Sequence, residues 1–280
     1  MDLDDKTIAM IGSGYIGQAL LNLWKGQGYH LIATTTSEEK RGALAQMADE
    51  AIVMKTSETE KLASVLERAD ACVITLAPRD GTGYSETYLK SAEDIAHLLQ
   101  HRKRPLHLIY TSSISVYGKP HISPVTEDLP LHPETDNQRI LAATEETYLG
   151  IQNPLVGVTV LRLGGIFGPG RDLSSRAARL LTRPMPGTGE EKTNHTHLDD
   201  IIGAIDFCLR NGVYGAYNLT MDAHPTRREL YGKLAIELSL PQPKWDPALP
   251  SAHGIGMAVD SSKLKAKGYS FAHDKLFASE

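Results

Sequence analysis

The first residues with evident chemistry lie near the N-terminus, at 12–17 (GSGYIG), and fit the pattern GxGxxG. In such a turn the first glycine permits a tight bend, the second lets the backbone approach a pyrophosphate, and the third lets a helix pack on a strand. An apolar run at 7–11 precedes the turn and helical spacing at 16–24 follows it. In that context the free N–H groups at the helix start can meet phosphates, and a turn that binds nothing is the less favoured alternative. The expected dinucleotide contacts are Gly12, Ser13, Gly14, Tyr15, Ile16 and Gly17.

The end of the second predicted strand, at 30–35, indicates which dinucleotide to expect. Proteins that bind NAD usually carry an Asp or Glu there, which holds the ribose 2′-hydroxyl. Here the strand ends in three threonines and a serine at 34–37, with no acid. The pattern favours NADP over NAD, because the hydroxyls at 34–37 and the cations Lys40 and Arg41 could bind a 2′-phosphate on the ribose. A solvated helix face explains the two cations equally well. The candidate contacts are Thr35, Thr36, Ser37, Lys40 and Arg41.

Further segments follow in order along nearly the whole chain. They are 110–118 (YTSSISVYG), 161–170 (LRLGGIFGPG), 197–200 (HLDD), 217–219 (YNL) and 262–269 (SKLKAKGY). Together with the glycine turn, they resemble the extended short-chain dehydrogenases/reductases of the nucleotide-sugar epimerase/dehydratase type. The resemblance implies an NAD(P)-dependent oxidoreductase with a small-molecule, nucleotide-sugar-like substrate. It also implies a homodimer formed through helices near 86–101 and 135–150.

The catalytic set of that family needs a Ser or Thr, a Tyr that exchanges a proton, and a Lys that lowers the pKa of the Tyr. Ser113 falls where the family places its Ser or Thr. When the next helix is aligned on Glu145, the positions of the Tyr and the Lys fall at Asn137 and Leu141. Neither residue can donate a proton or carry a charge near neutral pH. The sequence therefore resembles the atypical members of the superfamily.

Two other side chains are candidates for the missing chemistry. Tyr117 lies on the same loop as Ser113 and is a candidate proton donor, although an aromatic packed beneath the loop is the favoured alternative. Arg139 is a candidate cation, and a surface or ribose contact is its alternative.

The resemblance also implies cofactor contacts at further strand ends, and the candidates are Ala77, Pro78, Thr111, Ser112, Leu163, Gly164 and Ile166. Three cations, Arg171, Arg176 and Lys192, are candidates for clamping a diphosphate or carboxylate, with surface charge as the default interpretation.

Residues 195–200 contain two histidines, at 195 and 197, followed by two aspartates, at 199 and 200, and these residue types can bind a metal. Nothing nearby in the sequence completes a ligand set, so no metal is expected. We expect Asp199 or Asp200 to cap the following helix instead.

The elements that must position these residues alternate between strand and helix over the first half of the chain. Such alternation predicts an α/β fold, a Rossmann-type doubly wound parallel sheet, with a small C-terminal substrate lobe. The expected division is 1–165, with a later strand at 216–219, and an interleaved lobe over most of 166–280. Within this frame, 57–60 (SETE) predicts a capping box, and the basic run 101–104 (HRKR) predicts a cap on the preceding helix.

Composition narrows the class of protein. The chain has 280 residues and a formal net charge of −5, which argues against nucleic acid or an anionic membrane surface as partner. No apolar stretch is long enough for a membrane span, and the acidic start is unlike a secretory signal. The two cysteines are expected to be buried and reduced, so a cytoplasmic protein is expected.

Two functions remain at this stage. The first is an oxidoreductase with an altered acid–base set, in which Ser113 binds the reacting oxygen and Tyr117 or a water handles the proton. The second is an NADP(H)-sensing regulatory protein with little or no turnover.

Overall fold

The computed structural model describes residues 5–78, 83–119, 122–249 and 255–276. The chain forms two compact units. The first comprises residues 1–112, 135–162 and 202–217, and the second comprises 113–134, 163–201 and 218–280. The units are interleaved along the sequence, and residues 113–134 belong to the second.

The central feature is a seven-stranded sheet with the order β10-β6-β5-β4-β1-β2-β3. The pairs β1–β2, β2–β3, β1–β4 and β4–β5 are all parallel. The order reverses direction between β1 and β4, as in a doubly wound fold, so the predicted fold class is confirmed. The strands are β1 (Thr7–Ile11), β2 (His30–Thr35), β3 (Glu50–Val53), β4 (Ala71–Ile74), β5 (Leu106–Ser113), β6 (Val156–Leu163) and β10 (Gly215–Leu219).

Helices connect the strands, and each begins close to where the sequence predicts it. They are α1 (Tyr15–Trp24), α2 (Glu38–Leu44), α3 (Thr59–Arg68), α4 (Ser91–Leu99), which follows a π-helical turn η1 (Ser85–Lys90), α5 (Asp136–Gly150) and α7 (Leu198–Asn211). The strands bury near-continuous apolar runs because helices cover both faces of a parallel sheet.

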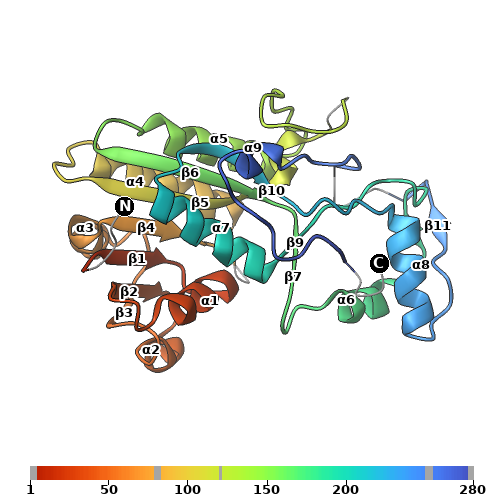
Figure 1. Cartoon of the computed structure of the whole chain (residues 1–280), viewed down its shortest axis with the longest axis horizontal. Helices are drawn as coiled ribbons and strands as arrows, with labels where there is room; N and C mark the ends of the chain where they lie inside the picture. The colour runs from red at the N-terminus through yellow and green to blue at the C-terminus, as the bar shows by residue number, and fades with distance from the viewer. Residues whose placement is uncertain (1–4, 79–82, 120–121, 250–254, 277–280) are drawn as a thin grey trace. The chain divides into compact units, whose positions relative to one another are not determined.

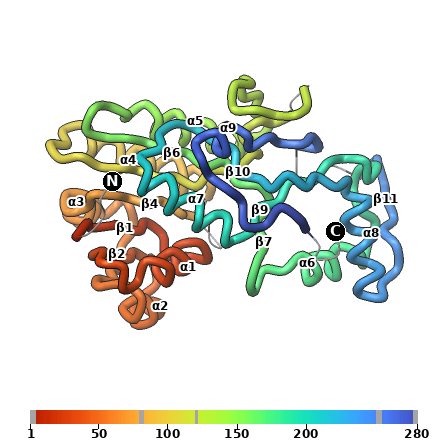
Figure 2. The backbone as a smooth tube through the Cα atoms, in the orientation of Figure 1, coloured from red at the N-terminus to blue at the C-terminus, as the bar shows by residue number. Residues whose placement is uncertain are grey.

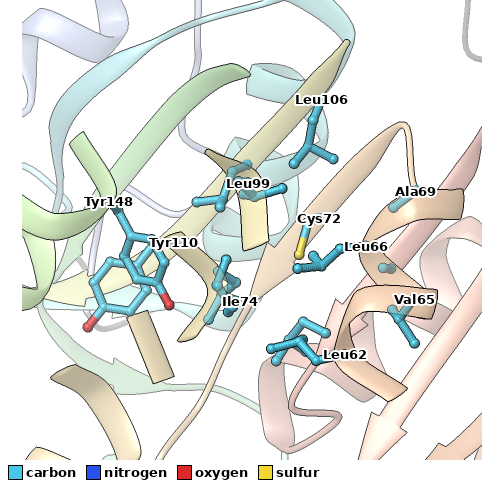
Figure 3. Packing of buried hydrophobic residues seen from close by; sticks show 14 of the residues in the cluster. Leu62, Val65, Leu66, Ala69, Cys72, Ile74, Leu99, Leu106, Tyr110 and Tyr148 are labelled. Carbon is cyan, nitrogen blue, oxygen red and sulfur yellow. The ribbon is translucent and has the colours of Figure 1, made fainter. Parts of the chain in front are cut away.

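One face of the sheet packs against α3, α4 and α5. Figure 3 shows Leu62 and Leu66 of α3, Cys72 of β4, and Tyr110 of β5 beside Tyr148 of α5 in one apolar cluster. The rings of Tyr110 and Tyr148 have centroids 4.9 Å apart. In Figure 1, α1 and α7 lie in front of the sheet. The Trp24 indole N–H of α1 donates to Asp206 of α7 at 2.8 Å.

Both cysteines are buried and free, as expected. Burial raises the pKa of the Cys72 and Cys208 thiols to about 12. They therefore pack as apolar side chains and have little nucleophilic character near neutral pH.

One local expectation is wrong, and a second is wrong for Arg102. The capping box at 57–60 does not form, because α3 has Glu58 at its N-cap with no side-chain cap. The Glu58 carboxylate instead accepts from the backbone N–H of Lys55 at 2.7 Å. In the basic run, Arg102 donates to the carbonyls of Leu66 and Ala69, so it caps the C-terminus of α3 and not that of its own helix.

The second unit contains short pairs of strands and a pair of helices. The strands are β7 (Gly165–Phe167) with β9 (His195–His197), and β8 (Met185–Pro186) with β11 (Trp245–Asp246). The helices α6 (Leu173–Leu180) and α8 (Arg227–Glu237) lie side by side in Figures 1 and 2, around a core of Ala177, Leu230 and Leu234. A short helix, α9 (Ser262–Lys265), precedes the C-terminal segment. Among the described residues, no helix combines the length and apolarity needed to cross a membrane.

A buried histidine, His107, lies in the first unit with one of its ring nitrogens unpaired within the described part of the chain. His107 is 1% exposed, and its Nε2 lies 2.7 Å from the Thr159 hydroxyl. That hydroxyl donates to the Val213 carbonyl, so the ring donates through Nε2. The other nitrogen, Nδ1, has no hydrogen-bond partner among the described residues. Burial lowers the pKa of His107 to about 4.

We predict that His107→Gln flattens the pH dependence of stability between pH 7 and 5. The unfolded histidine binds a proton below pH 6.5 and the folded one only near 4, so stability falls as pH decreases through this window. The wild type should lose about 2 kcal/mol more than the variant between pH 7 and 5, measured by urea unfolding. Equal losses would show that His107 does not stay neutral in the folded protein.

Candidate functional site

The glycine turn joins β1 to α1 at the point where the strand order reverses. Gly12 has φ +91°, which favours glycine, and a Cβ there would lie 3.2 Å from the Thr75 carbonyl oxygen. The Thr75 hydroxyl donates to the Gly12 carbonyl at 2.5 Å. The first glycine therefore lets β1 turn tightly against the end of β4, as expected.

The other two glycines meet different surroundings. A Cβ on Gly17 would lie 2.7 Å from the Gly12 carbonyl oxygen, closer than packing allows. A Cβ on Gly14 would meet no described atom within 4 Å. The third glycine is thus needed for packing of the helix on the turn, whereas the second faces open space where a ligand can approach.

The start of α1 has the features of an anion site. Gly14 is the N-cap and has no side chain to cap the helix, and the first turn carries no acidic residue. Ser13 is 3% exposed, and its Oγ has no partner within the described part of the chain. The diphosphate of a dinucleotide fits this turn, because it would accept from the backbone N–H groups of the first helical turn and from the Ser13 hydroxyl.

The end of β2 lies beside this turn. The Thr34 Oγ1 accepts from the backbone N–H of Gly12 at 3.1 Å, which ties the two strand ends together. Thr35 is buried, and its Oγ1 accepts from the backbone N–H of Ser37 at 3.2 Å. Thr36 and Lys40 are exposed. Arg41 is also exposed and forms an ion pair with Glu38 at 3.2 Å.

The ends of β4 and β5 contain the next candidates. Ala77 is exposed and Pro78 is half-buried, and the following residues 79–82 of the loop lie outside the described residues. The Thr111 hydroxyl donates to the Ile74 carbonyl at 3.2 Å, which joins β5 to β4. The Ser112 hydroxyl donates to Glu145 at 2.5 Å, so that side chain is bound within the protein.

A buried ion pair fixes the position of α5 against this strand end. Arg162 of β6 and Glu145 of α5 have side chains 7% and 2% exposed, and they meet at 2.8 Å. The Nε atom of Arg162 also donates to both carboxylate oxygens, at 3.2 and 3.0 Å. With Ser112 as a second partner, the Glu145 carboxylate is well compensated for its burial.

The face of α5 that carries Glu145 also carries Asn137 and Leu141, which take the positions of the family's catalytic Tyr and Lys in the sequence alignment. Leu141, one helical turn before Glu145, is 5% exposed. Asn137, one turn earlier still, is exposed in the first turn of the helix. Arg139 is exposed, and its guanidinium lies 2.6 Å from Asp136.

Ser113 ends β5 and is half-buried. Its Oγ accepts from the backbone N–H of Ser115 at 3.2 Å and caps a short 3₁₀ helix, η2 (Ile114–Tyr117). Tyr117 is 1% exposed, and its hydroxyl donates to Asn218 at 2.7 Å. These contacts favour a packing role for Tyr117, and its role as proton donor stays a prediction.

In the second unit, the chain from Leu163 to Ile166 runs beside β9. Leu163 is buried, and Ile166 pairs with Thr196. The backbone N–H of Gly164 donates to Thr196 Oγ1 at 3.0 Å and points to the Leu219 carbonyl at 3.3 Å. That N–H is therefore bound within the unit. Arg171, Arg176 and Lys192 are exposed.

The helix α7 begins one residue before the two aspartates, so neither of them is its N-cap. The Asp199 backbone N–H donates to the Nδ1 of His197 at 3.2 Å, so a histidine serves as the capping acceptor. The buried Asp200 carboxylate accepts instead from the backbone N–H groups of Ala272 and His273, at 2.6 and 3.2 Å. The expectation that an aspartate caps this helix is wrong, because the tail takes up the Asp200 carboxylate.

The sequence analysis missed the C-terminal histidine. His273 Nε2 lies 3.0 Å from the Asp199 carboxylate, and its ring stacks on that of His197 with centroids 3.7 Å apart. A separation of 74 residues along the chain gave no local signal.

Comparison with known proteins decides the family. The profile of the NAD dependent epimerase/dehydratase family matches residues 9–220. The chain belongs to this family.

Relatives of known sequence cover nearly the full chain. Protein YeeZ of Escherichia coli K12 is 30% identical over 266 residues, which cover 92% of this chain and 93% of YeeZ. The 3-diazoavenalumate denitrifying reductase of a Streptomyces species is 24% identical over 275 residues, which cover 91% of this chain and 89% of the reductase.

Solved structures share the fold. A UDP-glucuronic acid 4-epimerase variant from Bacillus cereus, in complex with a fluorinated UDP-sugar and NAD, superposes with a TM-score of 0.78. It is 20% identical, and the match covers 96% of each chain.

We predict that Gly14→Ala weakens NADPH binding without changing stability, whereas Gly17→Ala lowers the stability of the fold. Ala at 14 enters open space at a φ of −85°, so stability should change by less than about 0.5 kcal/mol while NADPH affinity falls at least about tenfold. Ala at 17 meets a backbone oxygen and should lower stability by about 1–3 kcal/mol. Urea unfolding and titration calorimetry measure the two effects.

The matched control is Gly150→Ala, at an exposed glycine where a Cβ also meets no described atom within 4 Å. It should leave NADPH affinity unchanged. Unaltered affinity in Gly14→Ala would remove the turn from the binding site.

Proposed function

We propose that the chain is an NADP(H)-dependent oxidoreductase that works with a non-standard proton-transfer set. The observation that carries the proposal is the start of α1, with its uncapped N–H groups, the open space at Gly14 and the unpartnered Ser13 Oγ. A dinucleotide diphosphate satisfies all three.

The preference for NADP rests on the end of β2. No carboxylate follows the strand directly, and Thr36, Lys40 and Arg41 are exposed there. The Arg41–Glu38 pair joins side chains that are 60% and 71% exposed. Exposed pairs of this kind contribute little to stability, so the guanidinium can turn to a 2′-phosphate at small cost. The Bacillus cereus epimerase is described with NAD. The preference is thus a feature that this chain would not share with it.

The non-standard set rests on the register of α5. The ion pair with Arg162 fixes the place of Glu145, and in the alignment anchored on Glu145 the positions of the family's Lys and Tyr fall at Leu141 and Asn137. A buried leucine cannot lower a neighbouring pKa, and an amide cannot donate a proton as an acid. Proton transfer must then use another group.

The remaining residues suggest how a reduction would proceed. Bound NADPH supplies a hydride, and the acceptor also needs one proton. Ser113, at the end of β5, would hold the reacting oxygen by a hydrogen bond. Because the Tyr117 hydroxyl is buried and donates to Asn218, a water is the favoured proton source. Reduction of a double bond is balanced by this hydride and this proton.

Two relatives bear on the substrate. The Streptomyces relative is a reductase by name, which supports hydride transfer to the substrate. The Bacillus cereus structure contains a UDP-sugar, which supports a nucleotide-sugar-like substrate. The exposed Arg171, Arg176 and Lys192 are the candidate clamp for its anionic group.

The alternative is an NADP(H)-sensing protein with little turnover. The absence of a titratable group at Asn137 and Leu141 favours it, since cofactor binding would survive this change while proton transfer would not. Both functions need the same dinucleotide site.

The two functions are separated by measuring binding and turnover together. We expect calorimetry to give a dissociation constant for NADPH at least about tenfold lower than that for NADH. We also expect NADPH oxidation, followed by absorbance, with at least one member of a panel of carbonyl compounds and nucleotide sugars. Ser113→Ala should reduce this rate at least about a hundredfold without changing NADPH affinity.

Ser115→Ala, a neighbouring serine on the same loop, is the control and should retain the rate. Tight NADPH binding with no oxidation across the panel would favour the sensor. The absence of binding to either dinucleotide would overturn both functions.

A further inference from the structure

The start of α7 and the C-terminal segment bring three metal-ligating side chains together in the second unit. His197, Asp199 and His273 each offer one ligand atom, and these atoms all lie within 4.8 Å of one another. The Asp199 Oδ2 lies 3.4 Å from His197 Nδ1 and 3.0 Å from His273 Nε2. From these contacts we propose that His197, Asp199 and His273 bind a divalent transition-metal ion, with Zn²⁺ as the best match.

The distances suit a tetrahedral ion. Zn²⁺ binds histidine nitrogen and carboxylate oxygen at about 2.0–2.2 Å, which places neighbouring ligand atoms about 3.4 Å apart. The two distances from the Asp199 carboxylate lie close to this value. The two histidine nitrogens lie within 4.8 Å of each other, and rotation of an imidazole about χ2 is inexpensive. On binding the ion, His197 Nδ1 gives up the hydrogen bond that it accepts from the Asp199 backbone N–H at 3.2 Å.

The ligand types select the class of ion. Two imidazoles and one carboxylate form the set that holds Zn²⁺ with one position left for water, and they suit Co²⁺ and Ni²⁺ as well. Mg²⁺ and Ca²⁺ prefer oxygen ligands, so they are poor matches. The buried carboxylate of Asp200, next in the chain, adds negative charge close to the cluster.

The surroundings hold the ligands in place. Phe167 packs edge-on against His197 with centroids 4.9 Å apart. Asp200 holds the C-terminal segment in place through three hydrogen bonds. Its carboxylate accepts from the backbone N–H groups of Ala272 and His273, and its carbonyl accepts from the Tyr269 hydroxyl at 2.8 Å. His273 is therefore positioned by an anchored segment, and support of this kind around a metal ligand strengthens binding.

The site has a structural consequence. His197 and Asp199 belong to the start of α7, whereas His273 belongs to the C-terminal segment. An ion held by all three would cross-link the two and stabilise the folded state by mass action. The ion requires no dinucleotide, so its binding can be tested without reference to the proposed activity.

The experiment titrates the full-length chain, freed of metal by chelation, with Zn²⁺ in a calorimeter. We expect one equivalent of Zn²⁺ to bind with micromolar or tighter affinity, and the thermal midpoint to rise when it binds. His273→Gln and Asp199→Asn should each weaken binding at least tenfold and abolish the rise. Co²⁺ should give the visible absorption bands of a tetrahedral site in the wild type and not in His273→Gln.

The control is His101→Gln, at an exposed histidine far from the cluster in sequence, which should bind Zn²⁺ as the wild type does. Circular dichroism checks that each variant folds, and His273 is suitable because its side chain is 38% exposed. Binding that is equally tight in His273→Gln, or no binding above the level of a scattered surface histidine, would overturn the proposal.

Discussion

The site depends on one contact between two parallel strands, the hydrogen bond from the Thr75 hydroxyl to the Gly12 carbonyl at 2.5 Å. It joins the end of β4 to the turn after β1, where the strand order reverses direction. Gly17 must lack a side chain because that same carbonyl lies in the way, and α1 then begins directly over the strand ends. The orientation of the N–H groups in the first turn of α1 follows from this packing, so the proposed diphosphate site depends on the way the sheet is wound.

The second constraint is the buried pair of Glu145 and Arg162. Both charges lie in the apolar interior, and each would be costly alone. Because Glu145 is also bound by Ser112 at the end of β5, α5 can neither rotate nor slide without leaving a charge unpaired. This register leaves Leu141 buried and Asn137 exposed. The oxidoreductase and sensor proposals both start from that pair of residues.

Sequence patterns predicted the parts of the fold whose signals are local. The apolar run of β1, the glycines at 12–17 and the alternation of strands with helices gave the sheet and the turn, because hydrophobic spacing and glycine geometry act over a few residues. The capping box at 57–60 did not form because α3 begins one residue later than the pattern requires, with Glu58 and not Ser57 at the N-cap. The partner of Arg102 is the carbonyl of Leu66, in a helix more than thirty residues earlier in the chain. The residue spacing around Arg102 carries no information about so distant a contact.

The site was harder to predict for the same reason. The Ser112 hydroxyl donates to Glu145, and the buried Tyr117 hydroxyl donates to Asn218. Both contacts join segments that are distant in the sequence. The meeting of His197 and Asp199 with His273 is the clearest example. The sequence argued against a metal because nothing near 195–200 completed a ligand set, whereas the folded chain brings His273 of the tail to His197 and Asp199.

The central claim is that the N–H groups at the start of α1 receive the diphosphate of NADP(H). Nuclear magnetic resonance of the ¹⁵N-labelled chain during titration with NADPH tests it most directly. The account predicts that the largest amide shifts occur at Gly14, Tyr15 and Ile16, and that inorganic pyrophosphate produces weaker shifts at the same residues. Binding of NADPH with the strongest shifts elsewhere, and none at these three amides, would contradict it.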